Sequence, residues 1–410
     1  MKAGYKMTEV GVIPEDWEVS KFDALANIVR GKFSARPRND PKYYGGNFPF
    51  IQTGDVTRAG GSITSFTQTL NSSGLAVSKL FPKGTLFFTI AANIGDVGIA
   101  EFEAACPDSL VAITPLPFVD KRWLMYELGK RKKDFEKLAS PGAQLNINLE
   151  KLRPYLLPNP PLPEQRAIAK ALSDTDALLA SLDHLIAKKQ GIKQATMQQL
   201  LTGKTRLPGF GGDWVVKRLG EIAEMGSGGT PLSSVLAYYD GKIPWVSISD
   251  MTKGGKVIES TERNLTSLGL SNSAAQIFPV GTVLYAMYAS LGECSIAGVS
   301  LCTSQAILGI QPQNNLVADY LYYYLISLKS VVKTLGQQGT QSNLNKGMVQ
   351  NFQLNLPVVA EQTAIATVLS DMDAELVALA ARRAKTWDLK QAMMQALLTG
   401  RIRLLNDYAK

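Results

Sequence analysis

The sequence has almost none of the residues that metal and redox sites use. Its 410 residues contain one histidine, His184, and three cysteines, Cys106, Cys294 and Cys302, without Cys-x-x-Cys spacing. An odd count with no paired spacing is typical of buried thiols in a reducing compartment. His184 has no histidine partner, so we expect it to lie on a helix surface. These absences exclude a zinc site and a disulfide-stapled fold.

Long apolar runs and nucleotide-binding motifs are also missing. No apolar run reaches the roughly 18 residues of a membrane span, and no signal peptide opens the chain, so we expect a soluble cytoplasmic protein. No GxxxxGK[ST] motif occurs, which excludes a P-loop. Asn159-Pro160-Pro161 is followed by Leu162, whereas an adenine methyltransferase motif continues with an aromatic residue. A proline-rich lead into a helix is therefore the preferred interpretation of this segment.

Length and charge set the broad class of protein. The chain carries 43 Lys and Arg against 35 Asp and Glu, a net charge of +8, and 45% of its residues are hydrophobic. A chain of 410 residues is too long for one hydrophobic core and predicts two or more domains. The basic balance permits a polyanionic partner such as nucleic acid but does not require one.

An internal repeat covers nearly the whole chain. Pro14-Glu15-Asp16-Trp17 returns as Gly211-Gly212-Asp213-Trp214, and Phe81-Pro82-Lys83-Gly84-Thr85 returns as Phe278-Pro279-Val280-Gly281-Thr282, each at the same offset. Only the segment Phe48–Asp55 has an offset that is shorter by two residues. Self-similarity at one period predicts two copies of a scaffold whose loops differ in length and sequence.

Each half begins with a globular part. Short apolar runs bounded by Gly or Pro, such as Leu86–Ile90, Val283–Tyr285 and Ala306–Ile310, predict buried strands. Asp120–Leu138 and Val317–Leu335 have helical apolar spacing. We therefore expect an α+β fold, in which irregular sheets and a few helices form two pseudo-twofold-related globular domains.

Each half ends in a long helix. Pro163 suits the first helical turn, and Gly203 and Gly400 suit the left-handed position after the last turn. Lys189 and Lys193 interrupt the apolar seam, so helix pairing should be firmest in the N-terminal half of each copy. The residues expected to pair the helices follow a seven-residue repeat and are Ile168, Leu172, Leu179, Leu182, Ile186, Ile365, Leu369, Met372, Leu376 and Leu379.

The two helices are expected to pair with each other as an antiparallel coiled coil. Each is a rod of about 60 Å with one apolar stripe to bury, and no other segment is as long. The expected boundaries are 1–157 and 204–354 for the globular domains, and 158–203 and 355–403 for the spacer helices. The linker after Gly203 has a copy after Gly400, so we expect a pseudo-twofold ring that is open at one linker.

Polar and basic loop residues are the candidates for contacts with nucleic acid. Cationic side chains suit phosphates and guanine edges, amides suit adenine edges, and hydroxyl groups suit either. For each candidate, a turn or a solvent-facing role remains the alternative. The candidates in the first half are Lys32, Arg36, Arg38, Gln52, Thr53, Arg58, Asn93, Gln144 and Asn146. Those in the second half are Thr230, Ser247, Ser249, Lys253, Tyr288, Ser290, Gln341 and Asn343.

Two charged features need separate interpretations. The run Lys130–Lys133 alternates with acidic residues, so it suits a solvated helix face at least as well as a phosphate contact. Asp55 and Asp250 occupy the same place in both halves, which favours a role in the scaffold over a role in base reading.

Together these motifs resemble the specificity subunit of type I restriction–modification systems. The resemblance rests on the Pro-Glu-Asp-Trp segment at Pro14–Trp17, the two Phe-Pro-x-Gly-Thr segments, the helix start Pro161–Ala169, and the Leu-Leu-Thr-Gly ends at Leu200–Gly203 and Leu397–Gly400. It covers essentially all of the chain, twice and in the same order. Val358-Val359-Ala360 replaces Pro-Leu-Pro at the second helix start, which should matter little.

The resemblance implies a non-catalytic, sequence-specific DNA-binding protein. Its globular domains would be target-recognition domains, each reading one half of a split, asymmetric site in double-stranded DNA, mainly in the major groove. The helices would set the gap and dock two DNA methyltransferase (modification) subunits, with restriction subunits in the full complex. No cofactor is expected in this chain, because S-adenosylmethionine would bind the modification subunits, and ATP and Mg²⁺ would serve the restriction subunits.

Two other interpretations remain open. A stand-alone DNA-binding protein could use the same domains without partner enzymes, and stable co-purification with a methyltransferase subunit would distinguish it. A fused enzyme with an unrecognised catalytic site would transfer methyl groups or cleave DNA as an isolated chain.

Overall fold

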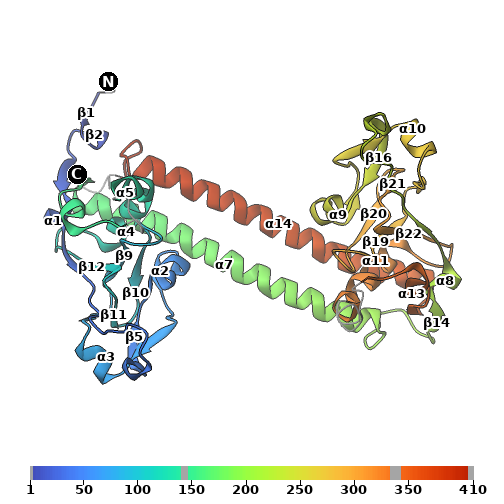
Figure 1. Ribbon diagram of the computed structural model, residues 1–410, viewed down its shortest axis with the longest axis horizontal. Helices are drawn as coiled ribbons and strands as arrows, with labels where there is room; N and C mark the ends of the chain where they lie inside the picture. The colour runs from blue at the N-terminus through green and yellow to red at the C-terminus, as the bar shows by residue number, and fades with distance from the viewer. Residues whose placement is uncertain (1–2, 140–145, 333–342, 405–410) are drawn as a thin grey trace. The chain divides into compact units, whose positions relative to one another are not determined.

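The chain folds into two compact units (Figure 1). The computed structural model describes residues 3–139, 146–332 and 343–404. One unit comprises Met1–Asp183 with Arg382–Lys410, and the other comprises His184–Ala381. Each of the two long helices therefore contributes residues to both units.

The first unit is built on a five-stranded sheet with the strand order β4-β12-β9-β10-β6. All neighbouring strands are antiparallel except β10 and β6. Strands β9 and β12 are buried apolar runs, as the sequence predicts. The strands are β4 (Ala26–Arg30), β6 (Ser62–Ile63), β9 (Leu86–Thr89), β10 (Val97–Ala100) and β12 (Leu110–Pro115).

A second sheet of this unit has the strand order β7-β5-β11-β8, and the candidates Gln52 and Thr53 follow its strand β5. Its strands are β5 (Tyr44–Phe50), β7 (Gln68–Leu70), β8 (Leu80–Phe81) and β11 (Ala104–Ala105). Strand β5 follows η1 (Pro41–Tyr43), and the helices after β5 and β7 are α2 (Thr53–Ala59) and α3 (Ser72–Ala76). The remaining elements are β1 (Tyr5–Thr8) paired with β2 (Gly11–Pro14), β3 (Glu18–Lys21) paired with β13 (Leu156–Asn159), and α1 (Phe22–Leu25).

The segment predicted as one helix at 120–138 forms two, α4 (Lys121–Lys130) and α5 (Lys132–Leu138). Arg131 separates them, because its N–H closes a tight turn onto Leu128 and Gly129 instead of continuing the helix. Figure 1 shows α4 beside the start of α7, and the Tyr126 hydroxyl donates to Asp176 of that helix at 2.7 Å. The short helix α6 (Leu149–Leu152) precedes β13.

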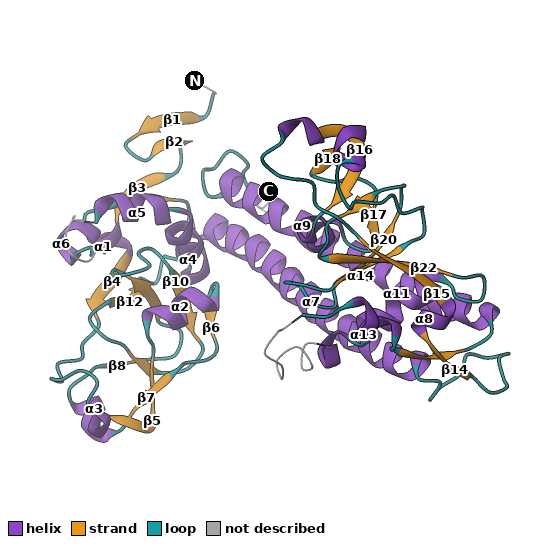
Figure 2. Cartoon of the chain, turned by 45° about the vertical axis from the view of Figure 1, so that its right-hand side comes forward, coloured by secondary structure: helices purple, strands orange, loops and turns teal. Residues whose placement is uncertain are grey.

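The second unit repeats this plan with a mixture of helices and strands (Figure 2). Its five-stranded sheet has the order β15-β22-β19-β20-β17, and a three-stranded sheet has the order β18-β16-β21. The strands are β14 (Val215–Arg218), β15 (Ala223–Ser227), β16 (Tyr239–Val246), β17 (Val257–Ile258), β18 (Arg263–Leu265), β19 (Val283–Ala286), β20 (Cys294–Ala297), β21 (Cys302–Thr303), β22 (Ile307–Pro312) and β23 (Gln353–Leu356). The helices are α8 (Leu219–Ile222), η2 (Leu236–Tyr238), α9 (Ile248–Gly254), α10 (Ser267–Ser271), α11 (Ala318–Ser327) and α13 (Lys346–Gln350).

The long helices are α7 (Leu162–Leu201) and α14 (Val359–Leu397). Pro163 lies in the first turn of α7, where its missing N–H removes no helical hydrogen bond. Gly203 and Gly400 follow the two helices with φ of 70° and 67°, values that suit glycine, and the Gly203 N–H donates to Leu200 O at 3.3 Å. The predicted start of α7 and both predicted ends are therefore confirmed.

The helices run antiparallel within each unit. In the first unit Asp176 pairs with Lys390 at 2.6 Å and Asp183 pairs with Arg383. In the second, Lys189 pairs with Glu375 at 2.7 Å and Lys193 pairs with Asp373. The lysines that interrupt the apolar seam therefore face acids on the opposite helix, so ion pairs continue the contact.

The seam residues differ in burial along the helices. Ile168 and Leu172 belong to a core shared with Trp17 and Leu397. The fully buried seam residues are Ile168, Leu172, Leu179, Leu182, Ile365 and Leu369, and the half-buried ones are Ile186, Met372, Leu376 and Leu379. Burial is deepest where a helix also packs on a globular domain.

The fold class is α+β, as the sequence predicts. All three cysteines are free and buried, and His184 is exposed on α7. Among the described residues, no helix combines the length and apolar character needed to cross a membrane. The same residues contain no group of three or more His, Cys, Asp or Glu that could hold a metal ion.

Candidate nucleic-acid interface

The basic stretch of the first unit lies in the exposed loop after β4. Lys32 and Arg36 are exposed, and the Arg36 guanidinium donates to the carbonyl of Ala35 at 2.7 Å. Arg38 Nη2 lies 2.7 Å from Asp108 Oδ2, and both side chains remain partly exposed. The loop thus presents three cationic side chains to solvent, and a carboxylate holds one of them.

Arg38 and Gln52 line the same cavity, which has a volume of about 500 Å³. Its aromatic residues form a cluster in which the Phe33 and Phe50 rings lie 5.0 Å apart. The Gln52 amide N–H donates to Gln68 Oε1 at 3.1 Å. The lining residues are Phe33, Arg38, Asn39, Pro41, Tyr44, Phe50, Gln52, Gln68, Pro107 and Ser109.

A hydrogen-bonded chain joins α2 to the loop after β9. The Thr57 hydroxyl donates to Asp96 Oδ2 at 2.6 Å and accepts from the Asn93 amide at 3.2 Å. Lys132, in the first turn of α5, pairs with the same Asp96. These contacts hold the exposed Asn93 next to Ala92, whose φ of 64° is unusual for a residue with a Cβ.

The candidates of the second unit lie on the equivalent loops. Ser247 caps α9, and Ser249 in its first turn is half-buried. Lys253 is exposed, with its ammonium 3.9 Å from Glu262. Thr230 is exposed before η2, Tyr288 is 39% exposed, and Ser290 is half-buried in the loop after β19.

Asp55 and Asp250 hold the starts of α2 and α9. Asp55 accepts from the backbone N–H of Gln52 at 2.8 Å and Asp250 accepts from that of Ser247 at 2.8 Å. Such carboxylates satisfy free N–H groups of a helix start. Arg58, an exposed candidate on α2, pairs with the same Asp55, and Thr53 of that helix is half-buried. The predicted scaffold role of both aspartates is confirmed.

The structure describes only two of the four amide residues predicted to contact DNA near 144 and 341. Gln144 and Gln341 lie outside the described residues. Asn146 is exposed and forms an antiparallel bridge with Ala91, which brings it beside the Asn93 loop. Asn343 is also exposed, and the N–H of the next residue, Leu344, donates to Met287 O at 3.0 Å, beside Tyr288.

The basic run Lys130–Lys133 does not form one solvated helix face. Glu127 is fully buried and pairs with Arg131, and the Lys130 ammonium lies 3.9 Å from its carboxylate. The Lys130 and Arg131 side chains are each only 12% exposed, while Lys133 is exposed. The expectation of a solvated helix face was therefore wrong for Lys130 and Arg131, because Glu127 one turn earlier pairs with both of them inside the domain.

The start of each long helix is held by a buried glutamate. Glu164 accepts from Trp17 Nε1 at 2.8 Å and from Arg403 at 2.7 Å, and Arg403 also bonds Asp16. Gln165 next to it accepts from the backbone N–H of Asp120 at 2.7 Å. The Glu-Gln pair of the helix-start motif therefore anchors the helix to its domain.

The second unit repeats this anchor. Glu361 accepts from Trp214 Nε1 at 3.1 Å and from Arg206 at 2.6 Å, and Gln362 accepts from the Val317 N–H at 2.9 Å. Arg206 and Arg403 follow Gly203 and Gly400 at the same distance in sequence. The segment after α14 therefore contacts the Trp17 segment as the linker after α7 contacts the Trp214 segment.

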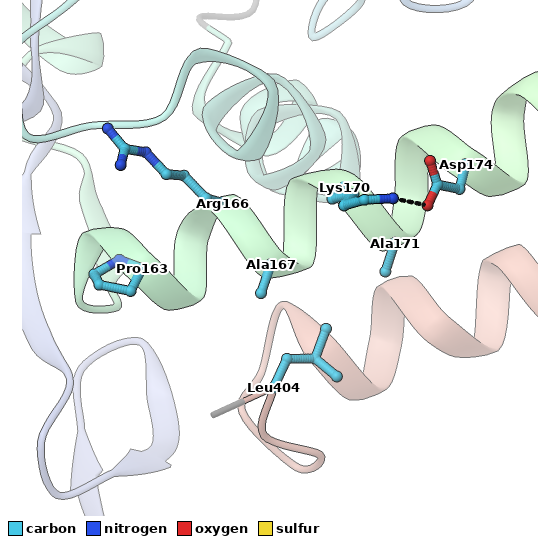
Figure 3. Close-up of a pocket in the computed structure, with 7 residues that line it drawn as sticks. All are labelled: Pro163, Arg166, Ala167, Lys170, Ala171, Asp174 and Leu404. Atoms are coloured by element: carbon cyan, nitrogen blue, oxygen red, sulfur yellow. Dashed lines mark hydrogen bonds and ion pairs between the residues drawn. The ribbon is translucent and has the colours of Figure 1, made fainter. Parts of the chain in front are cut away.

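One face of α7 in the first unit forms an open hollow of about 580 Å³ (Figure 3). Ala167 and Ala171 point from the helix toward Leu404, and Lys170 pairs with Asp174 at 2.6 Å. The lining residues are Pro163, Arg166, Ala167, Lys170, Ala171, Asp174 and Leu404. Small side chains flanked by charged ones thus line this face.

Sequence reasoning missed Gln68, Asp108 and Arg263. Gln68 and Arg263 are recognised only from strand register, because they lie opposite Phe50 and Trp245 on neighbouring antiparallel strands. Asp108 lies 70 residues from its partner Arg38. No local pattern marks such pairs, although a polar residue in the strand that faces a candidate loop is a signal that could have been followed.

Comparisons with known proteins give the family. The type I restriction modification DNA specificity domain matches twice, at residues 14–194 and 211–386. A Methanocaldococcus jannaschii protein described as the specificity subunit of the type I restriction enzyme MjaX is 25% identical over 98% of this chain and 97% of its own length. The MjaIX specificity subunit of the same organism is 32% identical over 39% of this chain and 38% of its own length.

Solved structures have the same fold. The type I restriction–modification S subunit of M. genitalium has a TM-score of 0.59 at 17% identity and covers 97% of this chain and 99% of its own. A chain from a study of assembly and conformational transition in a type I R-M system has a TM-score of 0.60 at 19% identity and covers 95% of this chain and 99% of its own. The chain belongs to the family of type I restriction–modification specificity subunits and contains two copies of the DNA specificity domain.

Proposed function

We propose that this chain selects the DNA sequence for a type I restriction–modification complex, with each domain reading one half of a split, asymmetric site in double-stranded DNA. The observation that carries the proposal is the duplicated scaffold with unlike loops. Gln52 stands where the second unit has Ser247, and Asn93 stands where it has Ser290. Unlike loops on like scaffolds suit two different half-sites, whereas identical domains would suit a palindrome.

The long helices dock two methyltransferase subunits, one for each repeat. The exposed hollow around Ala167 and Ala171 supports this role, because small side chains allow another surface to approach closely. In the second copy, Thr363 and Thr367 replace Arg166 and Lys170, so the two docking faces differ in charge.

The docking proposal has a matched test. Arg166→Glu with Lys170→Glu should reduce co-purified methyltransferase from two subunits per chain to one, measured by native mass spectrometry. Thr363→Glu with Thr367→Glu makes the same test on the other face. Two bound subunits with both double variants would contradict docking at these faces.

The helices also act as the ruler between the half-sites. Recognition domains one DNA turn apart, about 34–36 Å, would lie on the same face of the duplex. Deleting seven residues from the middle of both α7 and α14 keeps the seam in phase and should shorten the gap while leaving the half-sites unchanged. An unchanged gap would rule out the ruler.

In this proposal the cofactors bind the partner subunits and not this chain. S-adenosylmethionine binds the modification subunits, which methylate an adenine after flipping it from the duplex. ATP and Mg²⁺ serve the restriction subunits. The isolated chain should therefore neither methylate nor cleave DNA, and either activity would favour the fused-enzyme interpretation.

The deciding experiment is methylation mapping of genomic DNA from cells with this chain and its methyltransferase, compared with cells that lack the chain. A split motif with a methylated adenine in each half supports the proposal. No chain-dependent methylation, combined with sequence-specific binding by the chain alone, would favour the stand-alone DNA-binding protein.

A further inference from the structure

An antiparallel strand pair of the first unit places two amide side chains side by side at its end. Strands β5 and β7 are antiparallel, with Phe50 opposite Gln68, and Gln52 lies two residues beyond Phe50. Residues two apart on an extended chain project from the same face, so the side chains of Gln52 and Gln68 can meet. Their amides are joined at 3.1 Å above the cavity with the aromatic cluster.

The second unit has an equivalent antiparallel strand pair with different side chains. Strands β16 and β18 place Trp245 opposite Arg263, and Ser247 lies two residues beyond Trp245. Both strand pairs contain a register irregularity at the equivalent place, between Tyr44 and Phe48 in the first and between Tyr239 and Ile243 in the second, so they are structurally equivalent. The pair Ser247 and Arg263 therefore occupies the place of Gln52 and Gln68.

We propose that this cross-strand pair is a base-reading position in each domain, where Gln52 with Gln68 reads an adenine–thymine pair and Arg263 reads a guanine–cytosine pair. The proposal rests on the proposed function and adds Gln68 and Arg263 as specificity-determining residues. It also assigns a base preference to one position of each half-site.

The amide pair has the groups that an adenine edge requires. The Gln52–Gln68 bond uses one N–H of Gln52 and leaves its second N–H available, and its Oε1 has one lone pair for a base besides the one that faces the N–H of Asp55 in the capping box of α2. Adenine presents the N7 acceptor and the N6 donor in the major groove, and one glutamine can engage both. Gln68 fixes the orientation of that glutamine, and the aromatic rings lining the cavity suit the methyl group of the paired thymine.

Arg263 has the donors and the exposure that a contact with a guanine edge requires. Its side chain is exposed and its guanidinium carbon lies 5.9 Å from the centre of the Tyr239 ring. Within the described ranges, no carboxylate forms an ion pair with it, so its fork of N–H donors faces solvent. A planar guanidinium held against a ring is suited to the O6 and N7 acceptors of guanine, a bidentate contact that lysine cannot reproduce.

The test uses the complex of this chain with its methyltransferase subunits and a DNA library in which each half-site position is randomised. Gln52→Ala with Gln68→Ala should remove the preference for one A·T pair in the first half-site by about 5- to 150-fold, the range for one bidentate base contact. Arg263→Ala and Arg263→Lys should each remove the preference for one G·C pair in the second half-site. Arg218→Ala, at an exposed arginine of β14, is the control for loss of charge.

The outcomes separate the inference from the proposed function. Half-site preferences that survive in all three variants overturn the inference while leaving the proposed function standing. A uniform loss of affinity for every sequence in Arg263→Ala, with the salt slope reduced by about one, would make Arg263 a phosphate contact and also overturn it. Absence of any chain-dependent methylation in the wild-type complex would instead remove the proposed function.

Discussion

The two units have different side chains at equivalent positions of the helix that packs beside the long helix. Beside the long helix, the first unit buries Glu127 with Lys130 and Arg131, and burial raises the pKa of the Glu127 carboxyl. At the same positions the second unit has Tyr324, Ser327 and Leu328, with the Tyr324 hydroxyl bonded to the Gln353 carbonyl. The fold accommodates an ionic set at these positions in one unit and a largely apolar set in the other.

Two kinds of contact onto the long helices are alike in both units. Tyr126 donates to Asp176 and Tyr323 donates to Asp373, each at 2.7 Å. The two buried glutamates at the helix starts have the same kinds of donors. The repeat therefore preserves the seating of each domain on its helix, while the domain interior and the loops vary.

The largest difference between the units should come from the buried ion cluster. Glu127→Ala leaves two cations buried without their carboxylate, so we expect a loss of about 3–5 kcal/mol in unfolding free energy. Tyr324→Phe, at the equivalent position, removes one hydrogen bond and should cost about 1 kcal/mol. Urea unfolding of the full chain measures both.

Replacing all three residues of the ion cluster by those of the second unit tests whether the loss of pairing causes the destabilisation. Glu127→Tyr with Lys130→Ser and Arg131→Leu installs the residues of the second unit in the first, and it should be far less damaging than Glu127→Ala alone. Equal destabilisation by the triple and the single variant would show that the surroundings, and not pairing, decide the cost.

Next in size is the glutamate at each helix start. Glu164→Ala leaves the buried Trp17 N–H without an acceptor and breaks the bonds to Arg403, so we expect a loss of about 2–3 kcal/mol. Glu361→Ala should cost about the same in the second unit, because Trp214 and Arg206 have the same roles. A cost confined to one of the two would show that the anchors are not equivalent.

A smaller loss of unfolding free energy should follow from removing the contacts of Lys256, a residue found in the second unit alone. Lys256 pairs with Asp319 and donates to Ser370 of α14 at 2.7 Å, and the equivalent residue of the first unit is Gly61. Lys256→Met should lower the unfolding free energy by about 1–2 kcal/mol, because it removes both contacts. The exposed Lys253→Met is the control and should be nearly neutral.

The smallest expected effect is a loss of stability at low pH that involves Asp16. Hydrogen bonds from Arg403 lower the pKa of Asp16, whereas Arg206 of the second unit bonds the carbonyls of Gly211 and Gly212 instead. A carboxyl whose pKa is lowered on folding stabilises the protein above its unfolded pKa, and this stability is lost as the pH falls through the folded value. Below about pH 4, wild type should lose a stabilisation that Asp16→Asn lacks throughout. Parallel pH profiles of unfolding for the two proteins would contradict this.

Much of the architecture could be predicted from local pattern. The repeat offset, the long helices with their proline start and glycine ends, the buried strands and the scaffold role of Asp55 and Asp250 are written in residues close together in the chain. The candidate site was harder, because Asp108 meets Arg38 and Gln68 meets Gln52 only after distant strands come together.

By itself, the sequence determined the duplicated α+β plan and the family, since hydrophobic period, caps and repeated motifs act over a few residues. Only the tertiary structure decided how side chains far apart in the chain combine. It paired Lys130 and Arg131 with the buried Glu127. It also placed Gln68 and Arg263 at the equivalent ends of two antiparallel strand pairs. The physical reason is that burial and strand register arise from contacts between distant segments, and no local spacing encodes them.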